Sequence, residues 1–436
     1  MVQSSTGAAA RAAVVLYPAS APALPLPPSP ALPEPDAAAR AHSDRVRAHV
    51  AGVIAGAGGW ITLERYLNEV LYAPGLGYYV AGARKFGADG DFVTAPEMTP
   101  LYGATLAGPI AAILAASERR EIVELGAGSG ALAASLLAAL AADGVAVTCY
   151  RIVEVSPELK ARQQAALAGV GVPVEWCMTL PEAIDGAVVA NEVLDAVAPH
   201  VIVRRGGAWF ERGVAGEGSR AAPRGGREPV GAKPAGAPSV PSASGPALVL
   251  ADRPLADGAL RALAEERFPP AIDYESEVNP AAEALVATLA RALVRGAIVI
   301  ADYGFPQAEY YHAQRATGTL VGHYRHRVHG DPLLWPGLTD LTAHVDFTAM
   351  AEAAHAAGLA VAGYTSQAAF LMAAGILDRL AGVGPPTAVA YLRAAAAVQR
   401  LLSPTEMGEL FKILVLARDD GIVWRYFAGV DRSHRL

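Results

Sequence analysis

Three glycines alternate with single residues in the segment 124–130, which reads Glu-Leu-Gly-Ala-Gly-Ser-Gly. The segment ends a short apolar run and precedes a helix-forming stretch, which predicts a turn at the carboxyl end of a strand. In parallel α/β sheets such a turn lets the backbone approach a ligand beside a helix N-terminus. Glu154 follows Gly130 by 24 positions, near the ~20 residues at which an acid typically binds ribose hydroxyls. The spacing therefore predicts an adenosine-containing ligand.

The details of the loop indicate which adenosine ligand it holds. Its spacing is GxGxG, whereas the nicotinamide and flavin fingerprint is GxGxxG, and Glu124 stands two residues before the first glycine. A carboxylate there repels a pyrophosphate but suits the cationic sulfonium and amino group of S-adenosylmethionine. We expect this cofactor to lie on Gly126, Gly128 and Gly130 between Glu124 and Glu154. The alternative is a glycine turn that only permits close helix packing.

Further segments with chemistry-bearing residues follow in a fixed order along the chain. They are YLNEVLYAPGLGYY (66–79), GDFVTAPE (90–97), the glycine loop, ANEVLDA (190–196), DYG (302–304), GLTDLTAHVDF (337–347), QAAFL (367–371) and MGELFK (407–412). On these segments the chain resembles the MidA family of methyltransferases from about residue 61 to residue 418, with an interruption at 213–247. The chain departs from the family pattern where Asp195-Ala-Val-Ala-Pro199 replaces Asp-Ala-Leu-Pro.

The resemblance implies an activity and an acceptor. The family includes a mitochondrial complex I assembly factor that methylates a protein arginine, so it implies a class I methyltransferase whose substrate is a protein, such as a respiratory-complex subunit. Two alternatives stay open: a protein that binds S-adenosylmethionine but acts as a scaffold for assembly, and a methyltransferase for a small molecule.

Asn191, Glu192 and Asp195 follow a predicted strand where a methyltransferase sheet presents its acceptor. Methyl transfer is an in-line displacement that depends on positioning. An arginine acceptor needs carboxylates that hold the guanidinium plane by bidentate hydrogen bonds. We therefore predict that Glu192 and Asp195 are catalytic and that Asn191 contributes to both sites. The alternative is that Asn191 caps a helix and Asp195 is a solvated acid in its first turn.

Two further segments lie beside these sites. Residues 90–97 suit a lid over the cofactor, where we expect Gly90, Asp91 and Thr94 to contact the methionine moiety; the alternative is an ordinary turn into a helix over 101–115. Asp302 and Tyr303 end a later strand, where Asp302 is expected to bind substrate and Tyr303 to line the acceptor channel as a catalytic residue, although a buried tyrosine is often structural.

Histidines are dense between residues 312 and 344, but their spacing matches no HExxH or other tight ligand set. We predict no metal, and assign His326, His344 and Asp346 to substrate docking or to a hydrogen-bonded core.

Alternating strand and helix patterns position these residues. Strands are expected at 121–125, 147–155, 187–190 and 296–301, with helices at 131–142, 157–167 and 281–294, which predicts βαβ units and a doubly wound, Rossmann-like parallel sheet. A late hairpin is expected from 411–417 and 422–427. The tyrosines of 66–79 are interpreted as packing residues.

Composition divides the chain and excludes some classes of protein. Proline-rich residues 1–42 predict a disordered tail, 43–120 a helical and lid region, 121–304 the core with a flexible insertion at 213–247, 305–400 a partly helical substrate-cleft subdomain, and 401–436 the last strands of the sheet. A net charge of -7 and two cysteines argue against nucleic acid, a disulfide framework and a secreted protein. No apolar run is long enough for a membrane span, so we expect a cytoplasmic protein, and the alanine and arginine usage indicates a bacterial genome.

Overall fold

The central element is a twisted sheet whose strands run in the order β15-β16-β10-β5-β2-β3-β4. The computed structural model describes residues 32–81, 94–216, 247–419 and 421–436. Five adjacent strands are parallel, whereas β16 is antiparallel to both of its neighbours, and the short β14 pairs with β10. The strands are β2 (Glu121–Leu125), β3 (Cys149–Val153), β4 (Val174–Cys177), β5 (Ile184–Asn191), β10 (Leu293–Phe305), β14 (Val345–Asp346), β15 (Ala360–Ser366) and β16 (Phe411–Ala417). This confirms the predicted doubly wound α/β fold.

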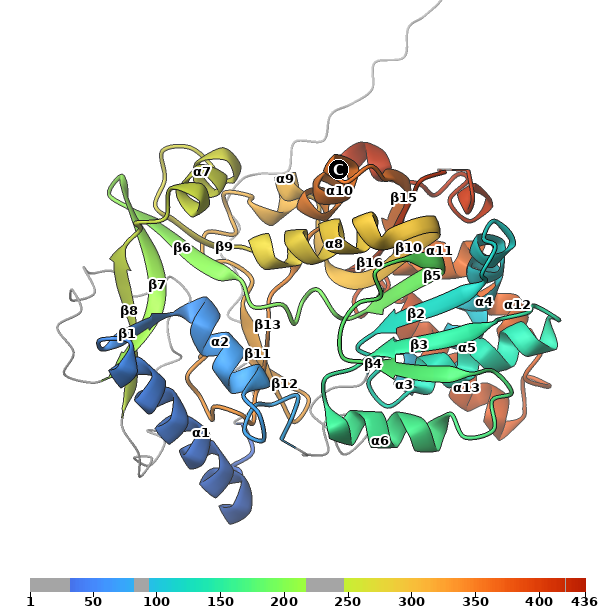
Figure 1. Cartoon of the computed structure of the whole chain (residues 1–436), viewed down its shortest axis with the longest axis horizontal. Coiled ribbons are helices and arrows are strands. Elements are labelled where there is room, and N and C mark those ends of the chain that lie inside the picture. The colour runs from blue at the N-terminus through green and yellow to red at the C-terminus, as the bar shows by residue number, and fades with distance from the viewer. Residues whose placement is uncertain (1–31, 82–93, 217–246, 420) are drawn as a thin grey trace, which may run out of the picture.

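Helices cover both faces of this sheet, which explains why its central strands β5, β2 and β16 are buried along nearly their whole length. One face packs against α8 (Pro280–Ala292) and α10 (Phe347–Ala356), which lie above the sheet in Figure 1. The other face packs against α4, α5 and the three helices that follow β15. These are α4 (Pro100–Ala115), α5 (Ala131–Ala142), α11 (Gln367–Ala373), α12 (Ile376–Ala381) and α13 (Val389–Leu402).

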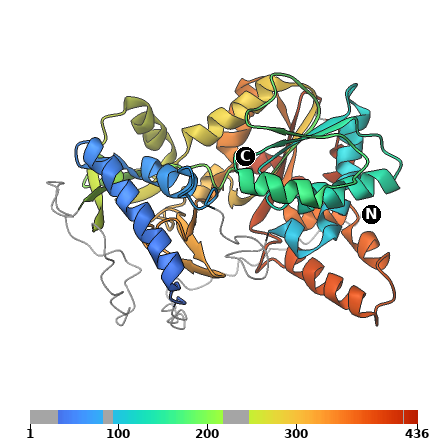
Figure 2. The same cartoon turned by 60° about the horizontal axis from the view of Figure 1, so that its bottom comes forward.

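A second sheet interrupts the predicted core. Its strands are all antiparallel, run in the order β1-β7-β6-β9 with β8 beside β7, and pack against α1 and α2. We call this sheet with its helices the N-terminal module: α1 (Ala37–Gly56), β1 (Trp60–Thr62), α2 (Leu63–Tyr72), β6 (His200–Arg205), β7 (Ala208–Gly216), β8 (Leu248–Pro254), α7 (Gly258–Arg267) and β9 (Tyr274–Val278). It lies on the left in Figure 1 and remains separate from the main sheet in Figure 2.

The expectation that residues 121–304 form the core with only a flexible insertion at 213–247 is therefore wrong, because residues 200–278 build most of the second sheet. The sequence held a sign of it in Gly206 and Gly207, which join β6 to β7 and have φ of 56° and 78°. Two residues with positive φ make the tight turn typical of a hairpin. Residues 213–216, assigned to the insertion, end β7; most of that insertion lies outside the described residues.

Two other predicted boundaries are corrected. The tail was expected to reach residue 42, but α1 begins at Ala37 because the Asp36 side chain accepts the Ala39 N–H and caps the helix; residues 1–31 lie outside the described part. The late hairpin is wrong as well. β16 pairs with β10 and β15, and the segment predicted as its partner contains a 3₁₀ helix, Trp424–Tyr426.

The expected subdomain over 305–400 is divided between the main sheet and smaller elements. β14, α10, β15 and the helices that follow it belong to the main sheet and its faces. The rest is α9 (Gln307–Tyr310) and a three-stranded sheet of β12 (Arg327–His329), β11 (Val321–Tyr324) and β13 (Asp340–Thr342). In the ranges that the structure describes, no helix is both long and apolar enough to cross a membrane.

The close approach of β5 to β2 at Gly186 provides a test of the central sheet. A Cβ added at Gly186 would overlap the Glu121 carbonyl oxygen, whereas one at Gly52, inside α1, would meet nothing. We expect Gly186→Ala to lower the free energy of unfolding by about 3 kcal/mol. The matched change Gly52→Ala should raise it by about 1 kcal/mol, because glycine weakens a helix interior. Urea unfolding measures both, and equal stability of the two variants would contradict the register of β5 and β2.

Candidate functional site

The glycine loop between β2 and α5 has the backbone that its sequence predicts. Gly126, Gly128 and Gly130 have φ of 60°, 54° and 87°, a region that residues with a Cβ rarely adopt. The Gly126 N–H donates to the Val153 carbonyl at 3.1 Å, which joins the loop to the end of β3. Gly126 is exposed and Gly128 half-buried, so the loop presents its backbone to a ligand.

The two acids flanking the loop lie near each other. Glu124 is buried and accepts the Tyr150 hydroxyl at 2.7 Å. The pKa of Glu124 is raised to about 7. Burial is the main cause and the Glu154 charge adds to it, whereas the hydrogen bond from Tyr150 lowers the pKa. Glu154 follows β3, and its Oε1 accepts the Ser156 N–H at 2.7 Å. A cation bound between these acids would favour the ionised form of Glu124.

Gln163 of α6 (Pro157–Ala166) links the glycine loop to Glu154. Its Nε2 donates to the Gly128 carbonyl and to Oε2 of Glu154, both at 3.0 Å, while its Oε1 accepts the Trp176 indole N–H at 3.0 Å. The indole nitrogen can only donate, so the amide orientation is settled. Gln163 is fully buried, and it therefore fixes the carboxylate expected to bind ribose relative to the loop.

Two exposed apolar side chains complete a surface that fits an adenosine. Val155 and Met178 have exposed fractions of 55% and 76%. They follow β3 and β4, whose ends are joined by the bond from the Glu154 N–H to the Cys177 carbonyl at 3.0 Å. Exposed apolar surface beside a ribose-binding acid suits the flat face of adenine. The glycines, Glu154 and these side chains together fit S-adenosylmethionine.

The short helix α3 (Ala95–Met98) joins the cofactor loop to the acceptor side. Glu97 accepts the Ser129 hydroxyl of the glycine loop, and the Ala95 N–H lowers the pKa of the Glu192 carboxyl. Thr94 is the N-cap of α3, although its side chain makes no capping bond. The predicted cofactor contacts Gly90 and Asp91 lie outside the described residues.

Glu192 lies directly beyond β5 with a φ of 54°, a conformation that costs a residue with a Cβ of order 1–3 kcal/mol and is typical of functional sites. Its carboxylate accepts the Asn191 amide at 3.1 Å, and Asn191 in turn accepts the Tyr102 hydroxyl at 2.8 Å. A Cβ at Gly126 would lie 3.5 Å from Val193 Cγ2, so this loop touches the glycine loop. Asn191 thus orients Glu192 beside the cofactor site.

The alternative, in which Asn191 caps a helix and Asp195 is solvated, is wrong. The segment after β5 consists of bends and turns and not of a helix, and Asp195 has an exposed fraction of 6%.

Asp302 has a different role from the predicted one. It is fully buried; its Oδ2 accepts the backbone N–H groups of Val193 and Leu194 at 3.1 and 2.9 Å, and its Oδ1 accepts that of Tyr303 at 2.9 Å. Both oxygens are engaged with backbone, so the expected substrate contact is corrected: Asp302 holds the loop that carries Glu192 and Asp195.

Burial raises the pKa of both candidate catalytic acids. The pKa of Glu192 rises to about 8, with the Asp195 charge adding to the effect of burial. The pKa of Asp195 rises to about 6, although the nearby Tyr303 hydroxyl opposes that rise. The structure thus brings Asn191, Glu192, Asp195 and Tyr303 together.

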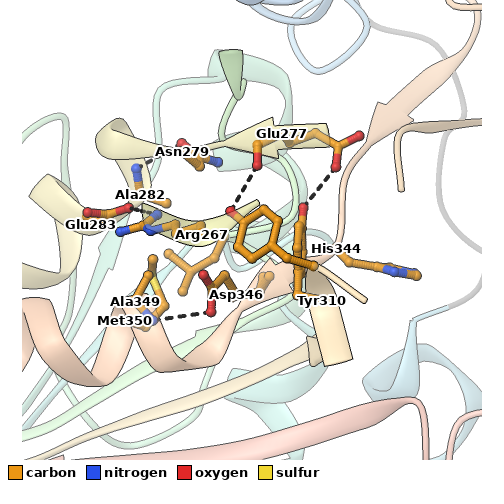
Figure 3. A pocket seen from close by; sticks show the side chains of 13 residues that line it. Arg267, Glu277, Asn279, Ala282, Glu283, Tyr310, His344, Asp346, Ala349 and Met350 are labelled. Carbon is orange, nitrogen blue, oxygen red and sulfur yellow. Dashed lines mark hydrogen bonds and ion pairs between the residues drawn. The ribbon is translucent and has the colours of Figure 1, made fainter. Parts of the chain in front are cut away.

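His344 and Asp346 line a small polar pocket next to this group (Figure 3). Oδ1 of Asp346 caps α10 by accepting the Thr348 and Ala349 N–H groups, and Figure 3 shows its carboxylate near Arg267. The His344 ring lies 5.2 Å from the Tyr303 ring, and burial lowers its pKa to about 4. His344 is therefore neutral and packs behind Tyr303.

His326 is not brought to these residues by the contacts that the structure describes. It is exposed in the two-residue turn between β11 and β12, with a φ of 59°. Among the described residues, no three histidine, cysteine, aspartate or glutamate side chains converge to hold a metal ion.

Sequence reasoning missed several residues of the site. Their shared feature is that a distant segment supplies each partner, and the set comprises Glu97, Tyr102, Gln163, Tyr79 and Asp340. The only signal available was that three of them, Tyr79, Glu97 and Asp340, stand in the segments that carry the family resemblance.

Comparisons with known proteins agree with this geometry. A family model of S-adenosyl-L-methionine-dependent methyltransferases matches residues 105–365. The chain is 30% identical over 402 residues to the protein arginine methyltransferase NDUFAF7, mitochondrial, of Mus musculus, covering 82% of this chain and 81% of that protein. The Drosophila melanogaster homolog is 28% identical over 393 residues, covering 82% of each. A COG1565 superfamily member from Burkholderia thailandensis, bound to S-adenosyl-homocysteine, matches with TM-score 0.82 and 47% identity over 93% of this chain and all (100%) of that one.

The role of Gln163 can be tested with a neighbouring control. Gln163→Glu replaces the amide donor by a carboxylate facing Glu154, so we expect the Kd for S-adenosylmethionine to rise by roughly 10- to 100-fold. Gln164 is exposed on the same helix, and Gln164→Glu should leave the Kd unchanged. Isothermal titration calorimetry with both variants measures the difference. Equal affinities would show that Gln163 does not position the cofactor-binding acid.

Proposed function

Because the chain belongs to the family of S-adenosyl-L-methionine-dependent methyltransferases, we propose that its acceptor is an arginine side chain of a protein. One observation carries the proposal: the half-buried Glu192 and the buried Asp195 share a loop that lies beside the glycine loop. A planar cation with several N–H donors is the group that two neighbouring carboxylates bind best. The arginine methyltransferases among the relatives support the same acceptor.

The chain's own residues would orient and activate the acceptor. The cofactor supplies a methyl group on a cationic sulfur. Glu192, held by Asn191 and Ala95, accepts N–H donors of the guanidinium and draws positive charge away from the attacking nitrogen. Asp195 accepts further donors, and Tyr303 packs beside it. Positioning of this kind is the main requirement of an in-line displacement.

The proton released by the reaction also needs an acceptor. An arginine nitrogen that gains a methyl group must lose one proton for the product to keep a single positive charge. Glu192, whose burial raises its pKa to about 8, is suited to take this proton and pass it to solvent. The raised pKa of Glu192 thus lets it hold the proton after methyl transfer. Before transfer, the bound cationic acceptor favours the ionised form of the Glu192 carboxylate.

The pH dependence of transfer follows from these pKa values. Arginine stays charged at every relevant pH, so the change arises in the enzyme: Asp195 ionises near pH 6 and Glu192 near pH 8. We expect kcat/KM for the acceptor to rise from pH 6 and level off above pH 8, because that ratio reports groups of the free enzyme. Glu192→Gln should lower the rate and remove the upper part of the rise. A flat profile between these values would contradict the two-carboxylate site.

Labelling of a lysate tests the activity and the acceptor together. The protein is incubated with methyl-labelled S-adenosylmethionine and a lysate of the source organism, and labelled proteins are hydrolysed to identify the methylated amino acid. We expect labelled methylarginine with the wild type and none with two variants. Gly128→Val cannot adopt the loop's positive φ and should lose cofactor binding, whereas Glu192→Ala should keep cofactor binding and lose transfer.

The other outcomes separate the remaining functions. Label in a small molecule without labelled protein would replace the protein acceptor by a small one. Retained biological activity in both variants would favour a scaffold for assembly over catalysis.

A further inference from the structure

Two tyrosines of the N-terminal module lie on the acceptor side of the site, one at the end of α2 and one shortly after it. The Tyr72 hydroxyl donates to the Ala196 carbonyl at 2.8 Å, next to Asp195. The Tyr79 hydroxyl donates to Oδ1 of Asp340 at 2.7 Å. The two rings stack with centroids 5.4 Å apart, and both side chains remain partly exposed. They therefore form a partly exposed aromatic pair beside the loop that carries Asp195.

Asp340 and Asp195 are held beside this pair by a backbone contact. The Ala343 N–H, just beyond β13, donates to the Asp195 carbonyl at 3.2 Å, which joins the strand of Asp340 to the loop of Asp195. Asp340 is buried, with an exposed fraction of 3%. Three separate parts of the chain, α2 with its following turn, β13 and the loop after β5, thus meet at one place.

Acids of both predicted sites affect the Tyr72 hydroxyl. Burial and then the nearby charges of Asp340, Asp195 and Glu154 raise the pKa of the Tyr72 hydroxyl. Glu154 is the acid expected to bind ribose, and Asp195 belongs to the acceptor loop. Tyr72 therefore lies within electrostatic range of acids from both predicted sites.

One carboxylate oxygen of this group, Oδ1 of Asp195, is buried and has no hydrogen-bond partner in the described part of the chain. Buried carboxylate oxygens are almost always paired, so a donor is expected here when substrate is bound. Aromatic faces beside carboxylates attract a flat, delocalised cation through the ring quadrupole as well as through charge.

We propose that Tyr72, Tyr79 and Asp340 form the acceptor-selecting wall of the site, holding a planar guanidinium on the aromatic pair while its N–H groups reach Asp195. The proposal rests on the arginine acceptor argued above. Tyr79 acts through Asp340, which it hydrogen-bonds and orients, whereas the ring of Tyr72 contacts the acceptor. The N-terminal module therefore contributes to specificity and does not merely pack against the catalytic sheet.

The test compares the affinity of the protein for a small guanidinium ion with its affinity for a cation that is not planar. Ethylguanidinium and ethylammonium are titrated into the complex of the protein with S-adenosyl-homocysteine, followed by NMR. We expect the wild type to prefer ethylguanidinium, and Tyr72→Leu and Tyr79→Phe each to reduce that preference by ~10-fold. Affinity for S-adenosyl-homocysteine should stay within about twofold, since neither tyrosine is hydrogen-bonded to the glycine loop.

A matched control distinguishes this role from simple packing. Tyr66, also in α2, is buried and donates its hydroxyl to the Pro332 carbonyl at 2.9 Å. Tyr66→Phe removes a hydroxyl as Tyr79→Phe does, and should leave the preference for ethylguanidinium unchanged. Asp340→Asn provides a further variant should Tyr72→Leu fail to fold, and it should lose the preference as Tyr79→Phe does.

The lysate labelling separates failure of this proposal from failure of the proposed function. Absence of methylarginine with the wild type would overturn the arginine acceptor itself. If Tyr72→Leu and Tyr79→Phe form methylarginine at wild-type rates and keep the preference for ethylguanidinium, the role proposed for these tyrosines is wrong. The proposed arginine methylation would be unaffected by that result. A higher KM for the labelled protein with kcat little changed in Tyr79→Phe would support it.

Discussion

The active geometry depends on the bonds that the buried Asp302 carboxylate accepts from the backbone beyond β5. These N–H groups belong to Val193 and Leu194, and hydrogen bonds of this kind are worth about 0.5–1.5 kcal/mol each. They tie the ends of two central strands together, and the bond from the Glu192 N–H to the Ala301 carbonyl at 2.8 Å adds to this link. Without them the positive φ of Glu192 would lose this support.

A cluster of buried acids is costly in the ligand-free enzyme, and the structure shows how that cost is reduced. Asn191 donates to Glu192, and burial raises the pKa of all three acids, Glu192, Asp195 and Asp302. The pKa of Glu192 reaches about 8, so this carboxyl is largely protonated near neutral pH. Arrival of a cation reverses this balance, because it stabilises the ionised carboxylates. The site is thus selective for a positively charged acceptor for two reasons: it contains several acids, and their burial makes a cation necessary to ionise them.

Elements outside the main sheet contribute to one side of the site. A methyltransferase sheet alone would leave Asp195 and Glu192 facing outward beyond the strand ends. Tyr72, Tyr79 and Asp340 lie beside the loop of Asp195 through their hydrogen bonds and the contacts of β13. The proposed wall therefore combines a segment that precedes the main sheet with one that follows β10.

The sequence by itself determined the features that depend on local chemistry. The glycine loop was predictable because only glycine tolerates three positive φ values so close together, and α5 was predictable because its alanines and leucines favour a helix over its whole length. Only the tertiary structure decided the partner of β16, the second sheet and the use of Gln163 and Tyr79. Tyr79 and Asp340 are 261 residues apart in the chain, and contacts over such separations are set by packing and sheet order, which leave no periodic signal in a single sequence.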